Sequence, residues 1–182
     1  MTPTLSTIRT PLDRLASETA SGSADGSSAT TAYAYDPIGN RRTTSHNDTT
    51  STYTANALNQ YTAIDEAMPT YDADGNMTAD GRGWHYVWNG ENRMVCASNA
   101  EVVVTYAYDH RGRMVRKGIS REDTEARRIE YFWDDWNIIC ETHVSPISTN
   151  VTYNVWGLDL DGSLQGTGGV GGLLAVVRRR CV

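Results

Sequence analysis

The sequence has 182 residues, with 22 acidic against 16 basic ones, and its formal net charge of −6 argues against a general nucleic-acid binder, which would need a basic surface. Apolar residues make up 39% of the chain but are scattered, so we expect no membrane span, which would need roughly 18 or more consecutive apolar residues. The N-terminus lacks the apolar core of a signal peptide, so we expect no export signal within this sequence.

The aromatic residues are of an unusual kind, with ten Tyr and five Trp against one Phe. Aromatic rings with a polar edge suit a sheet surface that is half buried and half wet. Leu, Lys and Glu, which build amphipathic helices, are sparse. The composition therefore favours strands over helices.

The first 30 residues predict little regular structure. Residues 9–15 are a degenerate copy of a motif that recurs along the chain. Residues 17–31, which read SETASGSADGSSATT, are low in hydrophobicity and predict a flexible connection. We therefore expect 1–30 to precede the main repeat array.

Residues 31–157 contain a repeated seven-residue motif, which in its clearest form reads Tyr-Asp-x-x-Gly followed by a polar residue. Two strands of about five to six residues and two turns would fill the interval between copies. Together with the degenerate first copy, the motif occupies residues 9–15, 35–41, 55–61, 71–77, 88–94, 108–114 and 133–139.

The fifth position of the motif holds only Gly, Asn or Asp, the residues that enter the left-handed backbone region at least cost. The second position is mostly Asp or Asn, which can cap a turn through its own side chain. Each copy therefore predicts strand, tight turn and strand, and the fold class is an all-β array of antiparallel hairpins. The predicted turn residues are Asp13, Gly39, Asn59, Gly75, Asn92, Gly112 and Asn137.

The segments between the turns support this prediction, with one exception. Residues 101–108 and 129–133 are β-branched or aromatic and lack helical spacing. Residues 120–128 are charged and poor in strand formers, so we expect a longer exposed loop with room for one helical turn.

The last segment, 158–182, is predicted to be a Gly-rich segment followed by a basic tail. Residues 166–171 match G-x-G-x-x-G, but a dinucleotide site needs an acidic residue about 20 positions later. Only 11 residues follow Gly171 and none is acidic, so we expect a glycine turn. The basic run at 178–180 is interpreted as a solvated tail.

These motifs resemble the YD repeats of the Rhs (rearrangement hotspot) proteins, which are also found in the shell subunits of insecticidal toxin complexes and in teneurins. The resemblance covers about residues 9–172. It is sharpest at 131–141, which is similar to the family's Y-x-Y-D-G-W-N-L-I-A-E block. Residues 155–174 resemble the stretch that leads into the Rhs-associated core.

The resemblance implies a long β-sheet that spirals into a hollow shell, which encloses a toxic C-terminal domain or presents a cell-surface ligand. We therefore expect a non-enzymatic structural segment, extracellular or at the cell surface, whose partners are the remainder of the shell and its toxin cargo. The family's Asp-Pro-x-Gly self-cleavage motif is missing from the C-terminal part, and residues 36–39 (DPIG) are interpreted as a turn. Both ends therefore look truncated.

The sequence offers no catalytic or metal-binding constellation. No two histidines stand at a metal-ligand spacing, no serine lies in a G-x-S-x-G frame, and the three cysteines are too widely spaced for zinc. Two acidic pairs lack the further oxygen ligands of a calcium loop. We predict no catalytic residue, no cofactor and no metal; the residues considered are His46, His85, His110, His143, Cys96, Cys140, Cys181, Asp72, Asp74, Asp159 and Asp161.

An alternative function is carbohydrate binding, because exposed Trp and Tyr rings can stack on sugars. Cross-strand packing and lining of a shell compete with that interpretation. A remnant without function is a further alternative, and an enzyme that uses the Gly-rich segment is the weakest. The candidate stacking residues are Trp84, Trp88, Trp133, Trp136 and Trp156.

Overall fold

The computed structural model describes residues 4–21, 28–121, 124–168 and 171–181, and its regular elements in these ranges are all strands. This confirms the predicted all-β class. The chain divides into two units, Met1–Arg82 and Gly83–Val182. In the described ranges there is no apolar helix of the length that crossing a membrane requires.

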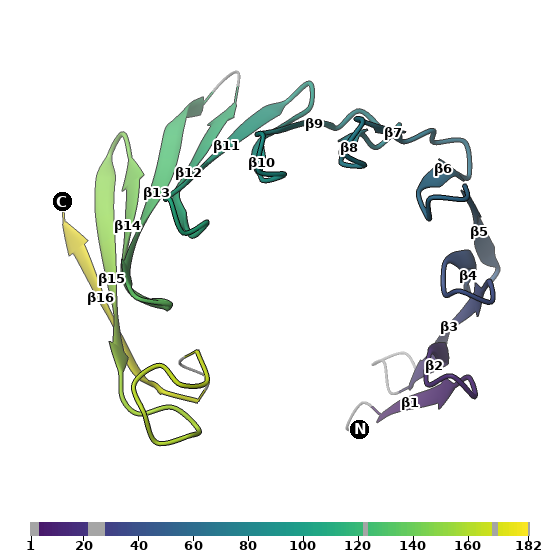
Figure 1. Cartoon of the computed structure of the whole chain (residues 1–182), viewed down its shortest axis with the longest axis horizontal. Coiled ribbons are helices and arrows are strands. Elements are labelled where there is room, and N and C mark those ends of the chain that lie inside the picture. Colours follow the sequence, from purple (N-terminus) through teal and green to yellow (C-terminus); the bar gives the residue numbers. More distant parts are fainter. Residues whose placement is uncertain (1–3, 22–27, 122–123, 169–170, 182) are drawn as a thin grey trace. The chain divides into compact units, whose positions relative to one another are not determined.

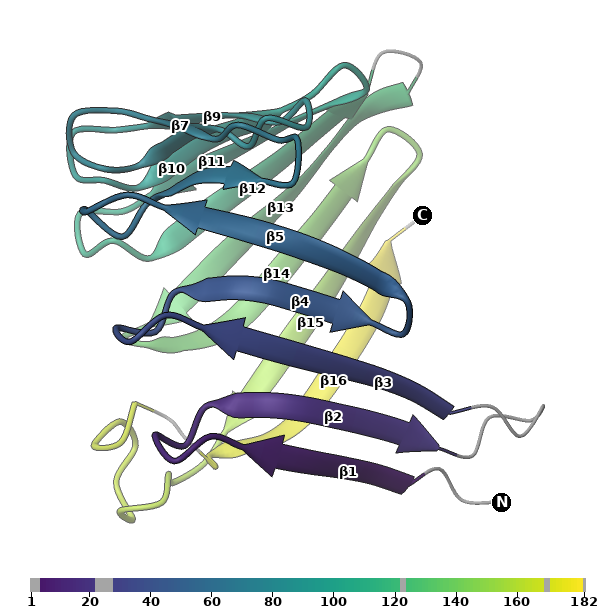
Figure 2. The same ribbon diagram turned by 90° about the vertical axis from the view of Figure 1, so that its right-hand side faces the viewer.

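The first unit is a meander in which each strand pairs antiparallel with the next (Figure 2). A short hairpin, β7–β8, follows it. The strands are β1 (Thr4–Arg9), β2 (Leu15–Ser21), β3 (Ser28–Tyr35), β4 (Arg41–His46), β5 (Thr49–Ala55), β6 (Tyr61–Ile64), β7 (Thr70–Tyr71) and β8 (Met77–Ala79).

The second unit is likewise an antiparallel meander, running from β9 to β16 and drawn from teal to yellow in Figure 1. Its longest strands lie toward the C-terminal end. The strands are β9 (His85–Trp88), β10 (Met94–Ser98), β11 (Val102–Tyr108), β12 (Met114–Arg121), β13 (Thr124–Asp134), β14 (Asn137–Ser145), β15 (Ser148–Trp156) and β16 (Leu173–Cys181).

Each sheet is a single layer, and the side chains do not build a deep core. The buried apolar side chains of the described residues are small ones such as Ala67 and Ala97. In β3 the alternate residues Tyr33 and Tyr35 are half-buried, while Ala34 between them is exposed. Backbone ladders and cross-strand side-chain pairs therefore hold these sheets together, which explains the need for aromatic rings with polar edges.

Residues 17–31 are largely strand, so the prediction of a flexible connection is wrong for the described part. β2 and β3 pair from Ser17 to Ser21, and the hydroxyls of Thr19 and Thr30 lie 3.1 Å apart across the pair. A single-layer sheet demands no continuous apolar face, and low hydrophobicity therefore did not prevent strand formation. Residues 22–27 lie outside the described ranges.

Residues 120–121 and 124–128 also lie in strands instead of the expected loop. β12 continues to Arg121 and β13 begins at Thr124, with Ile119 opposite Arg127. The charged side chains of Arg127 and Arg128 are exposed, which costs little where the sheet has no second layer. Residues 122–123 lie outside the described ranges.

The C-terminal residues expected to form a basic tail belong to β16. This strand pairs with β15 from Thr149 to Trp156, with one irregularity near the β15 end. The basic run therefore lies in an ordered strand at the margin of the sheet. The composition of this segment does not reveal its pairing with β15.

Candidate functional site

The repeated turns share one hydrogen-bond pattern, shown most completely by residues 36–40. The backbone N–H of Asp36 donates to the carbonyl of Asn40 (2.9 Å), and the N–H of Gly39 donates to the carbonyl of Asp36 (3.2 Å). The Asp36 carboxylate accepts from the N–H groups of Gly39 (2.7 Å) and Asn40 (2.8 Å). The same backbone pair closes the turns at 10–14, 56–60, 72–76, 89–93 and 109–113.

The residue at the fifth position of the seven-residue motif, the fourth of each turn, has positive φ, as a chain reversal of this kind requires. The values are 58° for Asp13, 108° for Gly39, 61° for Asn59, 88° for Gly75, 56° for Asn92 and 83° for Gly112. Asn and Asp tolerate this region better than other residues with a side chain. The sequence pattern therefore identified a backbone requirement.

Asn137 does not belong to this set, and its prediction as a turn residue is wrong. It is the first residue of β14, pairs with Asp134, and is only 4% exposed. The β13–β14 hairpin closes with the two residues Asp135 and Trp136, and Asp135 carries the positive φ (46°). The shorter loop moves the residue that follows it into the strand.

A seventh turn of the same kind lies at residues 159–163, and the sequence analysis missed it. The N–H of Asp159 donates to the carbonyl of Ser163 (2.7 Å), and the N–H of Gly162 donates to the carbonyl of Asp159 (3.0 Å). Gly162 has a φ of 79°. The Asp-x-x-Gly spacing was a usable signal, but the position before Asp159 holds Leu158 in place of an aromatic residue.

The residue at the sixth position of the motif, the last of each turn, contacts the next turn of the same unit in the following cases. Arg14 Nη1 donates to the carbonyl of Asp36 (3.0 Å), and its guanidinium lies over the Tyr35 ring (5.8 Å). Asn40 makes the corresponding contact with Asn59, from Nδ2 to Oδ1 (3.2 Å). We call the linked turns within each unit the turn column.

In the second unit two arginines make this contact. Arg93 donates to the carbonyl of Asp109 (3.5 Å), with its guanidinium 5.9 Å from the centre of the Tyr108 ring. Arg113 donates to the carbonyl of Asp135 and lies 5.7 Å from the Trp133 ring centre. In this unit the turn column therefore couples two hairpins to the ones that follow them, in each case through a charged donor and a stacked ring.

Gln165, in the loop after β15, also contacts the β13–β14 turn. Its Nε2 donates to the carbonyl of Asp134 (3.0 Å), and its Oε1 accepts from the N–H of Trp136 (3.2 Å). The loop after β15 thereby satisfies backbone groups that a two-residue hairpin leaves outside the ladder.

The aromatic residue that opens a motif also links it to the preceding motif. Its polar edge donates to a backbone carbonyl: Tyr35 Oη to Leu15 (3.0 Å), Tyr71 Oη to Tyr61 (3.0 Å), Tyr108 Oη to Met94 (2.9 Å) and Trp133 Nε1 to Met114 (2.9 Å). Trp156, which opens none of the motifs, makes a similar bond from Nε1 to the carbonyl of Ile138 (2.8 Å). Phe cannot make this bond, which accounts for the bias toward Tyr and Trp.

The capping carboxylates of the turn column are held in their charged form. Partial burial raises the pKa of Asp109, but hydrogen bonds from the Arg113 side chain and from the N–H groups of Arg113 and Arg111 outweigh burial and lower that pKa to about 2. The pKa values of Asp36 and Asp72 are lowered by similar backbone and Asn hydrogen bonds, against the effect of burial.

We therefore expect acid to destabilise the fold through this group. Because the pKa of folded Asp109 lies below its usual value of 3.8, its contribution is fully present above that value and is lost as pH falls through about 2. Urea unfolding should show that the free energy of unfolding falls less between pH 5 and pH 2 in Asp109→Asn than in the wild type, because Asn has no carboxylate to protonate. The turn accepts Asn, which occupies the equivalent position at residues 56 and 89. Equal losses in both proteins would contradict this assignment.

The five tryptophans proposed for sugar stacking do not share one environment. Trp133 and Trp156 use their ring N–H in the bonds to backbone carbonyls described above, and Trp84 and Trp88 are half-buried. Trp136 is 50% exposed, with the guanidinium of Arg111 5.2 Å from its ring centre. A stacking role stays a prediction, with Trp136 as its most accessible member.

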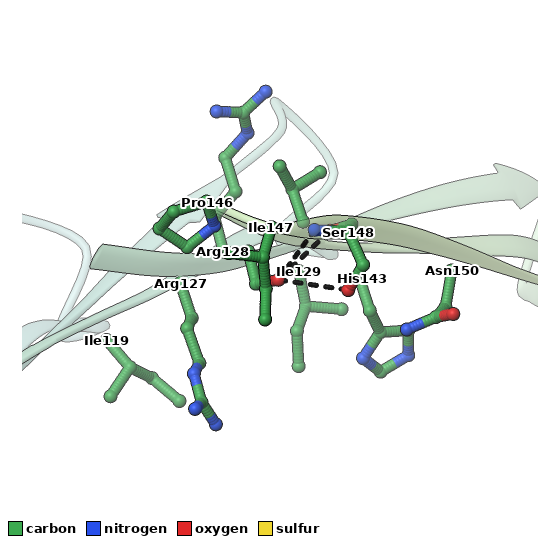
Figure 3. Close-up of a pocket in the computed structure, with 11 residues that line it drawn as sticks. Ile119, Arg127, Arg128, Ile129, His143, Pro146, Ile147, Ser148 and Asn150 are labelled. Atoms are coloured by element: carbon green, nitrogen blue, oxygen red, sulfur yellow. Dashed lines mark hydrogen bonds between the residues drawn. The ribbon is translucent and has the colours of Figure 1, made fainter. Parts of the chain in front are cut away.

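A depression of the second unit, with a volume of about 710 Å³, lies beside the β14–β15 turn (Figure 3). The pairing register places Ile129, His143 and Asn150 on one face of the sheet, and Arg128 and Val144 on the other. The Ser145 hydroxyl is engaged by Ser148. The depression is therefore an open surface feature that wraps a turn.

The described residues contain no group of three or more His, Cys, Asp or Glu that could hold a metal ion. His46 Nδ1 contacts the Thr31 hydroxyl (2.9 Å), and His143 Nε2 contacts Glu141 (3.3 Å). The polar groups of the turn column form hydrogen bonds with one another. The arrangement is suited to joining hairpins.

Comparison with known proteins gives a consistent result. A family model described as Teneurin YD-shell matches residues 18–153, which is more than half of the chain. The tRNA nuclease WapA of Bacillus subtilis (strain 168) is 30% identical over 131 residues, which cover 66% of this chain and 5% of that protein. The tRNA(Glu)-specific nuclease WapA of Bacillus subtilis subsp. natto is 30% identical over 104 residues, covering 54% and 4%. The chain thus spans about one-twentieth of the length of these relatives.

Among solved structures, the Photorhabdus luminescens Tc holotoxin pore aligns with a TM-score of 0.43 at 14% identity. The alignment covers 86% of this chain and 12% of that one.

Proposed function

Since the chain belongs to the YD-shell family, a group of Rhs/YD-repeat proteins, we propose that it forms part of the wall of a shell that encloses or presents a toxin in a delivery protein. The observation that carries this proposal is the turn column. Successive hairpins share hydrogen bonds, and at Arg14, Arg93 and Arg113 also ring contacts, as expected of a wall built by repetition. The partners would be the remainder of the shell and its toxin cargo, at the cell surface or outside the cell.

The architecture supports a wall more than a catalytic domain. A single-layer sheet presents two faces, which is what an enclosure needs, while it lacks the walls of a deep active site. Within the described residues, no metal cluster accompanies the carboxylates of the column, whose lowered pKa values follow from turn hydrogen bonds. A nuclease activity in the named relatives would then belong to another part of those much longer proteins.

A chimeric protein tests the proposal. The matched segment of Bacillus subtilis WapA would be replaced by residues 18–153 of this chain, and protease resistance of the C-terminal region of the chimera would be measured. We expect protection close to that of the parent protein. A chimera with Gly112→Val serves as a control and should lose protection, because a β-branched residue is strongly disfavoured at positive φ.

Loss of protection in the first chimera, with secondary structure intact by circular dichroism, would refute the wall role. Protection in both chimeras would show that the segment does not contribute to the enclosure.

Carbohydrate binding is a second candidate, favoured by the exposed Trp136 beside Arg111. A ring with one accessible face and an adjacent guanidinium could stack on a sugar and donate to its hydroxyls. We expect any glycan-dependent change in tryptophan fluorescence to disappear in Trp136→Ala. A flat response of the wild-type chain across a glycan panel would remove this candidate.

A further inference from the structure

The turn at residues 89–93, between β9 and β10, contains the one Asn-Gly pair of the sequence, Asn89-Gly90. Such pairs are prone to deamidation, because a glycine without a Cβ lets its main-chain nitrogen reach the preceding side-chain amide. Gly90 is exposed, and an added Cβ there would meet nothing within 4 Å. Its N–H takes part in neither of the backbone hydrogen bonds that close this turn. The nucleophile of the reaction is therefore unobstructed.

The side-chain amide of Asn89 is polarised by the turn. Its Oδ1 accepts hydrogen bonds from the N–H groups of Glu91 (3.0 Å) and Arg93 (3.0 Å). Two donors on one oxygen stabilise the negative charge that this oxygen acquires when a nucleophile adds to Cγ. Within the described residues, Asn89 Nδ2 donates to no partner, so no protein hydrogen bond holds the nitrogen that must leave.

The turn at residues 56–60 provides an internal comparison. Asn56 Oδ1 accepts from the N–H groups of Leu58 (2.9 Å) and Gln60 (3.0 Å), as Asn89 does in its own turn. The residue after Asn56 is Ala57, whose Cβ hinders attack on the side chain. In addition, Asn56 Nδ2 donates to Gln60 Oε1 (3.0 Å). The two turns therefore share a hydrogen-bond pattern and differ in the features that control deamidation.

The turn at residues 109–113 shows the geometry that the product of deamidation would adopt. Asp109 stands there at the position of Asn89 and accepts the same pair of backbone N–H bonds (2.9 and 3.0 Å). Its second oxygen, Oδ2, accepts from Arg113 Nε (2.7 Å). An aspartate at position 89 would place an oxygen where Asn89 now has its nitrogen.

Arg93 is the residue that such an aspartate would meet, because it holds in its turn the position of Arg113. It uses Nη1 both for the pair with Glu91 (2.7 Å) and for the bond to the carbonyl of Asp109 (3.5 Å). Among the residues that the structure describes, its Nε donates to none. The donor that pairs with the carboxylate in the turn at 109–113 is therefore available in this one.

We propose that Asn89 deamidates in the folded chain and that the resulting aspartate pairs with Arg93. The Gly90 nitrogen adds to Cγ of Asn89 and gives up its proton, the side-chain nitrogen leaves as ammonia, and a succinimide ring forms. Water then adds at Cγ, the bond from Cγ to the Gly90 nitrogen breaks, and that nitrogen regains a proton. The product is an aspartate with an unchanged main chain. The modification adds an ion pair to the turn column and does not depend on the shell role.

The fold disfavours the other way of opening the ring. Water attack at the main-chain carbonyl carbon of residue 89 would give isoaspartate and insert a methylene group into the main chain. The Asn89 carbonyl accepts from the N–H of Asn92 (3.0 Å), and the Asn89 N–H donates to the carbonyl of Arg93 (2.9 Å). A longer main chain would disrupt both bonds, so normal aspartate should be the main product in the folded chain.

The test of the reaction uses the full chain, incubated at mildly alkaline pH and sampled by peptide mapping with mass spectrometry. We expect conversion at Asn89 to be at least tenfold faster than at Asn56. Gly90→Ala should slow conversion at Asn89 at least tenfold and leave Asn56 unchanged. Electron-transfer fragmentation distinguishes aspartate from isoaspartate in the product.

The test of the ion pair uses Asn89→Asp, which supplies the product directly. We expect this change to raise the midpoint of thermal unfolding at neutral pH by about 2 °C. The gain should vanish when Arg93→Gln is added. Asn56→Asp is the matched control, because residue 60 of its turn is Gln instead of Arg, and it should bring no gain.

Three results would overturn the deamidation: isoaspartate as the main product, conversion at Asn89 no faster than at Asn56, or a rate that Gly90→Ala does not change. The pairing with Arg93 would be overturned if Asn89→Asp failed to raise the midpoint, or raised it equally with Arg93→Gln present.

Discussion

Gly112→Ala is expected to destabilise the second unit by about 2 kcal/mol. Two effects add at this position. The backbone has a φ of 83°, which strains any L-residue, and an added Cβ would lie 2.8 Å from Arg93 Nη2. Arg93 would have to move aside, which disturbs its pairing with Glu91 (2.7 Å) and its hydrogen bond to the carbonyl of Asp109 (3.5 Å). Urea unfolding followed by circular dichroism measures the loss.

Two other glycines serve as matched controls. Gly83 has a φ of 106° and open space around its Cβ direction, so Gly83→Ala should show the strain alone, about 1 kcal/mol. Gly90 has open space and no positive φ, so Gly90→Ala should be neutral or slightly stabilising. Equal effects at Gly112 and Gly90 would contradict the account of the turn.

Arg113→Ala is expected to cost about 2 kcal/mol, because it removes a charged hydrogen bond to a backbone carbonyl and the stacking on Trp133. The side chain is only 13% exposed, so solvent replaces little of what is lost. Arg116→Ala is the control, since its side chain is 61% exposed and its nearest carboxylate is 3.8 Å away. We expect that change to be within about 0.5 kcal/mol of neutral by thermal unfolding.

Lysine at position 113 separates charge from geometry. Arg113→Lys keeps the charge near Asp109 but loses the planar fork that reaches both that carboxylate and the carbonyl of Asp135. We expect most of the destabilisation of the alanine variant to persist. Full recovery by lysine would show that charge alone matters at this site.

The tight turns could be predicted from the sequence because their cause is local. A residue such as Gly39 or Asn92 reveals a positive φ through its own identity, and the capping Asp or Asn lies three positions earlier. The same logic was sufficient to find the turn at Asp159 and Gly162, but the missing aromatic residue concealed it. Local rules therefore located most turns and the fold class.

What the sequence could not supply depends on pairing between strands. The pairing of Ser17–Ser21 with β3 and of Leu173–Cys181 with β15 is set by neighbours along the sheet. The composition of these two segments suggested a linker and a tail. That prediction failed because a single-layer sheet accepts polar strands that a packed core would exclude. Asn137 was misplaced for a related reason, because the β13–β14 loop is shorter than the motif implies.

Hydrogen exchange measured by mass spectrometry on Arg113→Ala tests the turn column most directly. If each turn supports the next one, amide protection should fall in peptides covering residues 134–145, which contain the following turn and β14, as well as in 108–114. Protection in β9 should be unchanged. Loss of protection confined to residues 108–114 would mean that the turns are independent and that the column does not join the hairpins.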